Sequence, residues 1–257
     1  MPRLIKIGWG CGGALASRVI LPARNRVISS VRPHSEVSEE KTMNKQETRN
    51  LYRKRARSYD LSLWFFRLAG FHMDWYRRLT VDALSLKAGD TVVDLGCGTG
   101  LNFPYLEAAV GKEGRIIGVD LTDAMLIQAQ KRVNVAGWQN VDLIQTDLAE
   151  YSFPNGIAGI LSTFAITLVP EYDGVICRGA EALEPNGHLA VFDFKEPDNW
   201  PEWLVRFAAW LNKPYGVSLD LADRHPWEAV KENFQEVIFR EFYFGALYLS
   251  VGQKLVS

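Results

Sequence analysis

The segment VVDLGCGTG at residues 92–100 limits the possible folds of this chain more than any other segment. Val92 and Val93 are β-branched and apolar, which is typical of a buried parallel strand. Asp94 comes next, and three glycines follow it at positions 96, 98 and 100. Because glycine lets a backbone turn sharply and come close to a ligand, the segment predicts a strand followed by a loop that binds a small ligand.

A second acid indicates that this ligand contains a nucleoside. Asp120 ends the next apolar run, RIIGVD, twenty residues beyond Gly100. In dinucleotide-binding folds an acid at about this distance, at the end of the second strand, binds the ribose. The alternative is that the glycines serve only a tight turn, but the two acids together favour a binding site.

The charge and register of the loop distinguish between two kinds of cofactor. Dinucleotides place a pyrophosphate against a G-x-G-x-x-G loop, but this chain has Leu101 where the third glycine belongs. The carboxylate of Asp94 would repel a pyrophosphate, and this repulsion grows as water is excluded. S-adenosylmethionine carries an ammonium and a sulfonium instead, which Asp94 would attract. The loop therefore favours S-adenosylmethionine over NAD.

The two motifs VVDLGCGTG and GVDLTDAML resemble the first two motifs of the class I S-adenosylmethionine-dependent methyltransferases, and the likeness extends over roughly residues 85–195. The preceding segment, RARSYDLSLWFFRLAGFHMDWYRR, is similar to the entry region of the ubiquinone/menaquinone C-methyltransferases and the bacterial phospholipid N-methyltransferases. The resemblance implies an α/β fold, with a Rossmann-like seven-stranded sheet, an antiparallel C-terminal hairpin and helices on both faces. It also implies S-adenosyl-L-methionine as the cofactor.

The same resemblance assigns roles within the cofactor site. It implies that the glycine loop approaches the methionine part, that Asp120 binds the ribose hydroxyls, and that Asp147 accepts from the adenine amino group. Asp147 could equally cap a surface helix, and Cys97 could be a small buried side chain. The implied cofactor-binding residues are Asp94, Gly96, Cys97, Gly98, Gly100, Asp120, Leu121, Met125, Asp147, Leu148 and Thr163.

Hydrophobic periodicity predicts the arrangement of secondary structure. Beyond Met43, helical spacing is followed by alternating strands and helices, which indicates a parallel sheet. We expect helices over 44–58, 61–84, 101–110, 123–136 (capped by Thr122) and 171–183, strands at 91–95, 115–120, 141–145, 157–163 and 188–194, and a turn at 185–187. Two further apolar runs, FQEVIFREF and FGALYLSVG, predict a hairpin that turns near Tyr243.

Composition suggests three regions along the chain. Residues 1–42 are basic up to His34 and show little periodicity, so we expect a disordered extension that reflects a wrong or alternative start, or an organelle-targeting segment. Residues 43–84 are expected to form an N-terminal helical lid. Residues 85–257 are expected to form the donor-binding domain, with a cap insertion at about 196–230.

Aromatic residues concentrate outside the expected cofactor core, in segments 59–76 and 200–227. Their spacing in the second segment fits a cap helix that buries its apolar stripe on the sheet. They could instead form an acceptor pocket, either apolar for a quinone or lipid chain, or able to bind a methylated ammonium by cation–π attraction. Basic residues at positions 49, 53, 54, 55 and 57 form either a solvated helix face or a peripheral contact with anionic headgroups.

Methyl transfer is an in-line displacement, so the protein mainly holds the nucleophile and the methyl group about 3 Å apart and in line. An acceptor that is an amine or a phenol must also lose a proton. The candidate catalytic residues are Tyr59, His72 and Asp193. His72 could be a packing histidine and Asp193 could simply end a strand. We favour Tyr59, because the Tyr59-Asp60 pair matches the related families.

Charge and composition exclude other classes of function. The formal net charge of −1 and the lack of a basic stripe argue against nucleic acid as a partner. The cysteines and histidines are scattered, so no metal site is predicted. No apolar stretch is long enough to span a membrane, and the need for an intracellular cofactor predicts a cytoplasmic enzyme. A non-catalytic S-adenosylmethionine-binding module and a nucleotide-dependent oxidoreductase remain as alternatives, and the oligomeric state stays open.

Overall fold

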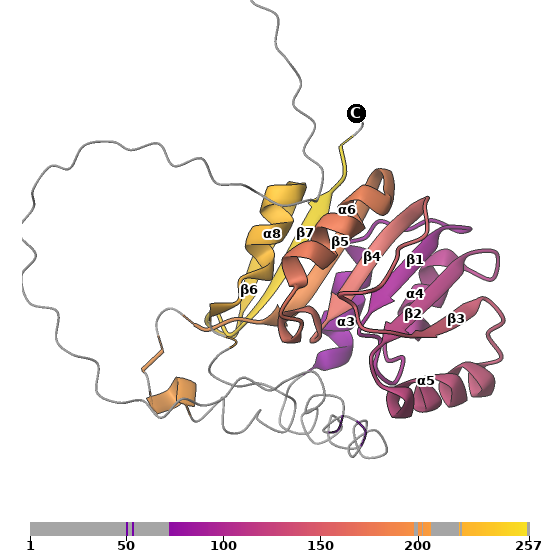
Figure 1. Cartoon of the computed structure of the whole chain (residues 1–257), viewed down its shortest axis with the longest axis horizontal. Helices are drawn as coiled ribbons and strands as arrows, with labels where there is room; N and C mark the ends of the chain where they lie inside the picture. Colours follow the sequence, from indigo (N-terminus) through magenta and orange to yellow (C-terminus); the bar gives the residue numbers. More distant parts are fainter. Residues whose placement is uncertain are drawn as a thin grey trace, which may run out of the picture. The chain divides into compact units, whose positions relative to one another are not determined.

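The computed structural model describes residues 50, 53, 72–197, 200–201, 203–206, 221 and 223–255. Residues Thr42–Ser257 form a compact unit of their own. Its described part contains a seven-stranded sheet of order β3-β2-β1-β4-β5-β7-β6 (Figure 1). The strands are β1 Thr91–Leu95, β2 Arg115–Asp120, β3 Val141–Gln145, β4 Ile157–Thr163, β5 Leu183–Phe194, β6 Gln235–Phe242 and β7 Leu247–Gln253.

Six strands of this sheet run in the same direction, and β7 runs antiparallel to them, between β5 and β6. Strand β1 pairs in parallel with both β2 and β4, whereas β7 pairs antiparallel with β5 and β6. The strand order reverses between β1 and β4, and in such sheets ligands bind beyond the carboxyl ends of the strands at this switch point. The predicted fold class, including the C-terminal hairpin, is confirmed.

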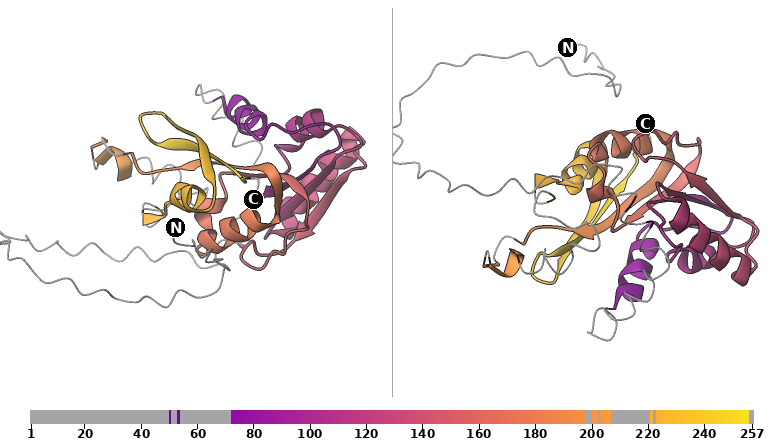
Figure 2. Two further views of the ribbon diagram at one scale, coloured as in Figure 1. Left: turned by 90° about the horizontal axis from the view of Figure 1, so that it is seen from above. Right: turned by 60° about the horizontal axis from the view of Figure 1, so that its bottom comes forward.

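Helices cover both faces of the sheet (Figure 2). The described helices are α3 Met73–Asp82, α4 Phe103–Val110, α5 Asp123–Ala136, the 3₁₀ helix η1 Ile166–Leu168, α6 Tyr172–Ala182 and α8 Pro226–Asn233. Apolar residues of α3, α4 and α5 share one buried cluster, and those of α6 and α8 share another. Because successive side chains of a strand point to opposite faces, Val92 belongs to the first cluster and Val93 to the second.

The predicted strands and helices of the core are present, with differences in detail at α4, at the cap of α5 and in β5, which begins at Leu183 rather than at 188. Helix α4 begins at Phe103 rather than at 101, since Asn102 occupies its N-cap position. Thr122 stands at the N-cap of α5 but makes no side-chain capping hydrogen bond. The turn expected at 185–187 lies inside β5, where the pairing with β4 shifts register and Asn186 has a φ of 66°.

Much of the predicted N-terminal region lies outside the described residues. This holds for the whole of 1–42, for Tyr59 and for most of the helices expected over 44–58 and 61–84, of which α3 is the last part. The greater part of the cap predicted at 196–230 is also outside them. Among the described residues, no helix combines the length and the apolar character that crossing a bilayer requires.

Candidate functional site

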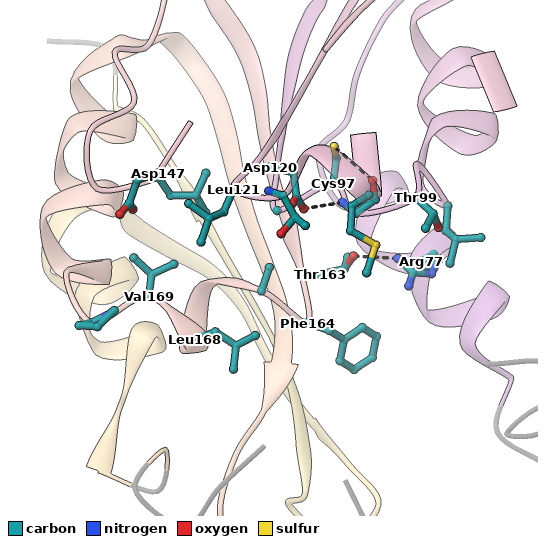
Figure 3. A pocket seen from close by; sticks show the side chains of 18 residues that line it. Arg77, Cys97, Thr99, Asp120, Leu121, Asp147, Thr163, Phe164, Leu168 and Val169 are labelled. Carbon is teal, nitrogen blue, oxygen red and sulfur yellow. Dashed lines mark hydrogen bonds between the residues drawn. The ribbon is translucent and has the colours of Figure 1, made fainter. Parts of the chain in front are cut away.

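A pocket opens at the carboxyl ends of β1, β2 and β4, next to the switch point (Figure 3). It combines the glycine loop, the end of β2, the segment after β3 and the segment after β4. The lining residues are Arg77, Gly96, Cys97, Gly98, Thr99, Leu101, Asp120, Leu121, Thr122, Met125, Asp147, Leu148, Thr163, Phe164, Ala165, Leu168, Val169 and Pro170. Nine of the eleven residues that the resemblance implied therefore line one cavity, and the exceptions are Asp94 and Gly100.

Asp120 links the glycine loop to the start of α5. One carboxylate oxygen accepts from the Gly98 amide at 2.9 Å, and the other accepts from the Thr122 amide at 2.8 Å. An ionised carboxylate has about four acceptor positions, so each oxygen retains capacity for a further donor from the pocket. Burial raises the pKa of Asp120, and the two backbone amides oppose this effect.

The backbone of the loop is closely fitted at Gly96. Its φ of 69° is in the left-handed region, and a Cβ placed there would collide with the Cβ of Ala165. Gly96 therefore lets the loop after β1 approach the segment after β4, and the two segments form adjoining walls of the pocket.

Gly100 serves packing and does not line the cavity. A Cβ at this position would lie 2.6 Å from the ring of Phe103, which is fully buried at the start of α4. Cys97 does line the pocket, and burial raises the pKa of its thiol well above the ordinary value. The thiolate is therefore disfavoured, which agrees with a small packing side chain and not with a nucleophile.

Asp94 lies beneath the loop, away from the pocket surface. Its side chain is fully buried, and Nδ2 of Asn102 donates to both carboxylate oxygens at 3.0 Å. Burial raises the pKa of Asp94 to about 7, although the Asn102 hydrogen bond and the charge of Arg77 act in the opposite direction. Direct contact between Asp94 and a cationic donor, which the sequence suggested, does not match this position.

Arg77 is the main lining residue that sequence reasoning missed. Its Nη1 donates to Oδ1 of Asn102 and to Oγ1 of Thr163, both at 2.9 Å, and its side chain is only 6% exposed. A signal was present in the sequence, because Arg77 falls on the buried stripe of α3 with Tyr76, Thr80 and Val81. A charged residue in such a stripe needs partners and so indicates a function.

The segment after β4 gives the pocket an apolar wall. Phe164 has a φ of 58°, a conformation that is unusual for a bulky residue and that recurs at functional sites. The guanidinium of Arg77 lies 5.8 Å from the centre of its ring. Leu168, Val169 and Pro170 continue this wall. No sequence motif marked these residues, because their meeting depends on the course of the loop.

Asp147 lies in the pocket, and the alternative that it caps a surface helix is wrong, because a turn and not a helix follows β3. The Asp147 carboxylate accepts from the Ala149 amide at 2.9 Å in this turn.

The structure does not bring the candidate catalytic residues together. His72 is exposed at the N-cap position of α3 and does not line the pocket, and Tyr59 is outside the described residues. Asp193 is buried behind the pocket, where it accepts from the amides of Thr167 and Phe194 at 3.1 and 2.8 Å. Burial raises the pKa of Asp193 to about 6. Asp193 therefore holds η1, and through it Leu168, in place.

Comparison with known proteins places this fold among the methyltransferases. Residues 92–187 match a family described as "Methyltransferase domain". The demethylmenaquinone methyltransferase of Listeria welshimeri is 31% identical over 169 residues, which cover 65% of this chain and 70% of that protein. The ubiquinone/menaquinone biosynthesis C-methyltransferase UbiE of Salmonella arizonae is 31% identical over 130 residues, which cover 50% of this chain and 51% of that protein.

Solved structures show the same fold. A SAM-dependent methyltransferase from Aquifex aeolicus aligns with a TM-score of 0.53 at 22% identity, over 70% of this chain and 89% of that one. The geranyl diphosphate C-methyltransferase of Streptomyces coelicolor A3(2) aligns with a TM-score of 0.57 at 14% identity, over 70% of this chain and 78% of that one. The chain belongs to the class I S-adenosylmethionine-dependent methyltransferases. Within that class it resembles UbiE and the demethylmenaquinone methyltransferases.

Proposed function

We propose that this chain uses S-adenosyl-L-methionine to methylate a small lipophilic acceptor, and that the acceptor is a quinone-like ring. The observation that carries this proposal is a single pocket in which polar groups and an apolar wall face each other. The glycine loop, Asp120 and Asp147 form the polar side, whereas Phe164, Leu168 and Val169 form the apolar side. The relatives named for demethylmenaquinone and for ubiquinone/menaquinone support the choice of acceptor.

The residues present fit the methyl donor. Asp120 keeps acceptor capacity for ribose hydroxyls after its two backbone contacts. Leu121, Met125 and Leu148 line the same cavity as Asp147 and supply apolar surface for a purine. When bound, S-adenosylmethionine supplies an activated methyl group.

The contribution of the protein is then positioning and exclusion of water. The loop after β1 and the segment after β4 are fixed against each other at Gly96, which holds the two walls of the pocket at a set separation. Such positioning can supply roughly 7 to 11 kcal/mol of the barrier reduction in an oriented reaction. The apolar wall from Phe164 to Pro170 removes water that would stabilise the charged reactant.

The proposal is tested by transfer of a tritiated methyl group from S-adenosylmethionine. Two acceptors are compared, a soluble demethylmenaquinone analogue and vesicles of phosphatidylethanolamine, and buffer alone serves as the blank. We expect label in the quinone. Label in the lipid alone would replace the quinone with a headgroup amine as the acceptor, and no label in either would contradict the proposal.

Asp120→Ala is the control variant for this assay. Loss of the ribose hydrogen bonds should weaken donor binding by about 1 to 3 kcal/mol. Calorimetry should show heat with S-adenosylmethionine and none with NAD for the unaltered protein. Heat with NAD alone would favour an oxidoreductase, and an unchanged dissociation constant in Asp120→Ala would remove Asp120 from the donor site.

A further inference from the structure

The donor pocket contains a buried cation whose role the assignments above do not explain. Arg77 is 6% exposed and lines the same cavity as Asp120. Burying a guanidinium is costly unless anionic or acceptor groups surround it. Its position in the pocket therefore calls for a ligand group of negative charge or for a compensating side chain.

The described protein groups accept hydrogen bonds from only one nitrogen of the Arg77 guanidinium. Nη1 donates to Asn102 and to Thr163, and among the described residues no hydrogen-bond partner is found for Nε or Nη2. Asn102 in turn donates to Asp94 and Thr163. These contacts fix the orientation of the guanidinium and leave one edge of it available, and that edge matches the two oxygens of a carboxylate.

The order of polar groups across the pocket indicates which ligand group meets this edge. In Figure 3, Asp147, Asp120 and Arg77 follow one another from one side of the cavity to the other. Asp147 is proposed for the adenine and Asp120 for the ribose, so Arg77 lies at the end that remains for the methionine moiety. The anionic group of that moiety is its carboxylate.

We propose that Arg77 binds the carboxylate of the methionine moiety of the methyl donor, and that Asp94 positions Arg77 through Asn102. This inference rests on the proposed function. In this arrangement Asp94 does not touch the donor ammonium, because Asp94 lies under the loop. Asp94 acts on the donor only through Asn102 and Arg77. Asp94 then holds Asn102 against Arg77 from below, and the donor carboxylate balances the charge of Arg77 from the pocket.

Calorimetric titration with two ligands tests the proposal without any acceptor. The ligands are S-adenosylmethionine and decarboxylated S-adenosylmethionine, which differ only in the carboxylate. The unaltered protein should bind the decarboxylated ligand about 10- to 100-fold more weakly, since hydrogen bonds to charged groups have this magnitude. Equal affinity for the two would overturn the proposal and leave the proposed function intact. Binding of neither ligand would overturn both.

Two variants of Arg77 separate recognition from a structural role. Arg77→Met should lose most of its affinity for S-adenosylmethionine and retain its affinity for the decarboxylated ligand, so that the preference disappears. Arg77→Lys keeps the positive charge but loses the planar pair of N–H donors that can bind both carboxylate oxygens. This variant should retain part of the preference for S-adenosylmethionine over the decarboxylated ligand. Equal weakening of both ligands in Arg77→Met would show that Arg77 only supports the fold, and would overturn the proposal.

The neighbouring Arg78 offers a matched control. It belongs to the same helix, is 72% exposed and pairs with Asp82 at 3.8 Å. Arg78→Met should leave both affinities as in the unaltered protein. If Arg77→Met does not fold, the comparison of the two ligands in the unaltered protein still decides the question. If Arg78→Met abolished the preference as well, the effect would belong to α3 as a whole and the proposal would fail.

Discussion

Gly96 shows how strongly one residue can determine the pocket. A side chain at this position would collide with the Cβ of Ala165, and the residue would have to adopt the left-handed backbone conformation that Gly96 has. We expect Gly96→Ala to destabilise the protein by more than the roughly 1 to 2 kcal/mol of the backbone effect alone, because the overlap adds about 1 to 3 kcal/mol. Urea unfolding measures the loss.

The control for Gly96 is Gly89, whose φ is 91° and whose Cβ would meet nothing within 4 Å. Gly89→Ala should show the backbone effect alone. Adding Ala165→Gly to Gly96→Ala should recover part of the stability, since it removes the obstructing methyl. Equal losses for Gly89→Ala and Gly96→Ala would refute the close fit of the loop.

Asp94 makes stability depend on pH. Its pKa in the folded protein is about 7, above the model-compound value of 3.8. The folded state therefore binds a proton that the unfolded state has lost, and this contribution is present at low pH and disappears as the pH rises through 7. The free energy of unfolding, compared with that of Asp94→Asn, should fall between pH 4 and 7 by about 1.4 kcal/mol for each unit of pKa shift.

Measuring both proteins at each pH cancels the titration of all other groups in this comparison. The difference between the two curves should level off above the pKa of Asp94. A difference that grows in favour of the unaltered protein as the pH rises would mean that Arg77 and Asn102 keep Asp94 ionised in the folded state.

At the scale of single elements, η1 depends on Asp193. The carboxylate accepts from two backbone amides, at Thr167 and Phe194. An amide side chain cannot accept with its nitrogen, so Asp193→Asn should lose about 1 to 3 kcal/mol of stability. Because η1 carries Leu168 into the pocket, donor affinity should fall while kcat changes little. Steady-state kinetics and chemical unfolding provide the two readouts.

A different result for Asp193→Asn would restore its predicted role in catalysis. If kcat collapsed while stability and donor affinity stayed the same, Asp193 would act on the acceptor proton. Asp142→Asn is a suitable control. Asp142 lies on β3, is half-exposed, and forms an ion pair with Arg115 of β2. It should alter neither readout.

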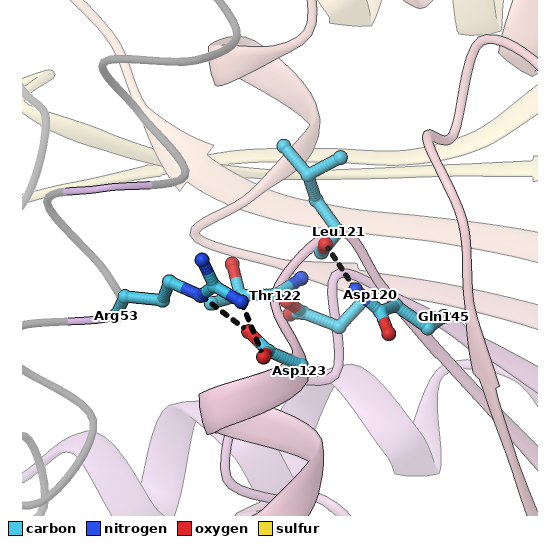
Figure 4. A network of polar contacts seen from close by, with 6 residues as sticks. All are labelled: Arg53, Asp120, Leu121, Thr122, Asp123 and Gln145. Atoms are coloured by element: carbon cyan, nitrogen blue, oxygen red, sulfur yellow. Dashed lines mark hydrogen bonds and ion pairs between the residues drawn. The ribbon is translucent and has the colours of Figure 1, made fainter.

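At the scale of the whole molecule, one ion pair joins two distant parts of the chain (Figure 4). Nε and Nη2 of Arg53 donate to the two carboxylate oxygens of Asp123 at 2.8 and 2.6 Å, across 70 residues of sequence. Asp123 begins α5, immediately after Thr122 of the pocket lining. The pair therefore ties Arg53 to the edge of the donor site.

Both partners of this ion pair are exposed, so its effect should depend on salt. Arg53→Glu and Asp123→Lys should each lower the melting temperature slightly, and the double variant should recover it. The coupling between the two positions should vanish in about 1 M salt. Strictly additive effects at low salt would show that the ion pair does not form in solution.

The sequence predicts the sheet and half of the site, because these depend on local patterns. The glycine loop, Asp120 and the strands follow from spacing and periodicity over short stretches. Arg77 and Thr163 meet across 86 residues, and Phe164 enters the pocket through an unusual backbone angle. Neither fact has a local signature. Asp94 was misplaced for the same reason, since only the packing of Asn102 shows that it lies below the loop.

The position of β7 between β5 and β6 has a consequence for biosynthesis. One hydrogen-bonding edge of β5 pairs with β4, and the other is covered by Leu247–Gln253 of β7, which are synthesised well after β5. Until β7 leaves the ribosome, a nascent chain displays an unpaired apolar edge, which is a template for aggregation. Chaperone demand should therefore be concentrated between the synthesis of β5 and that of β7.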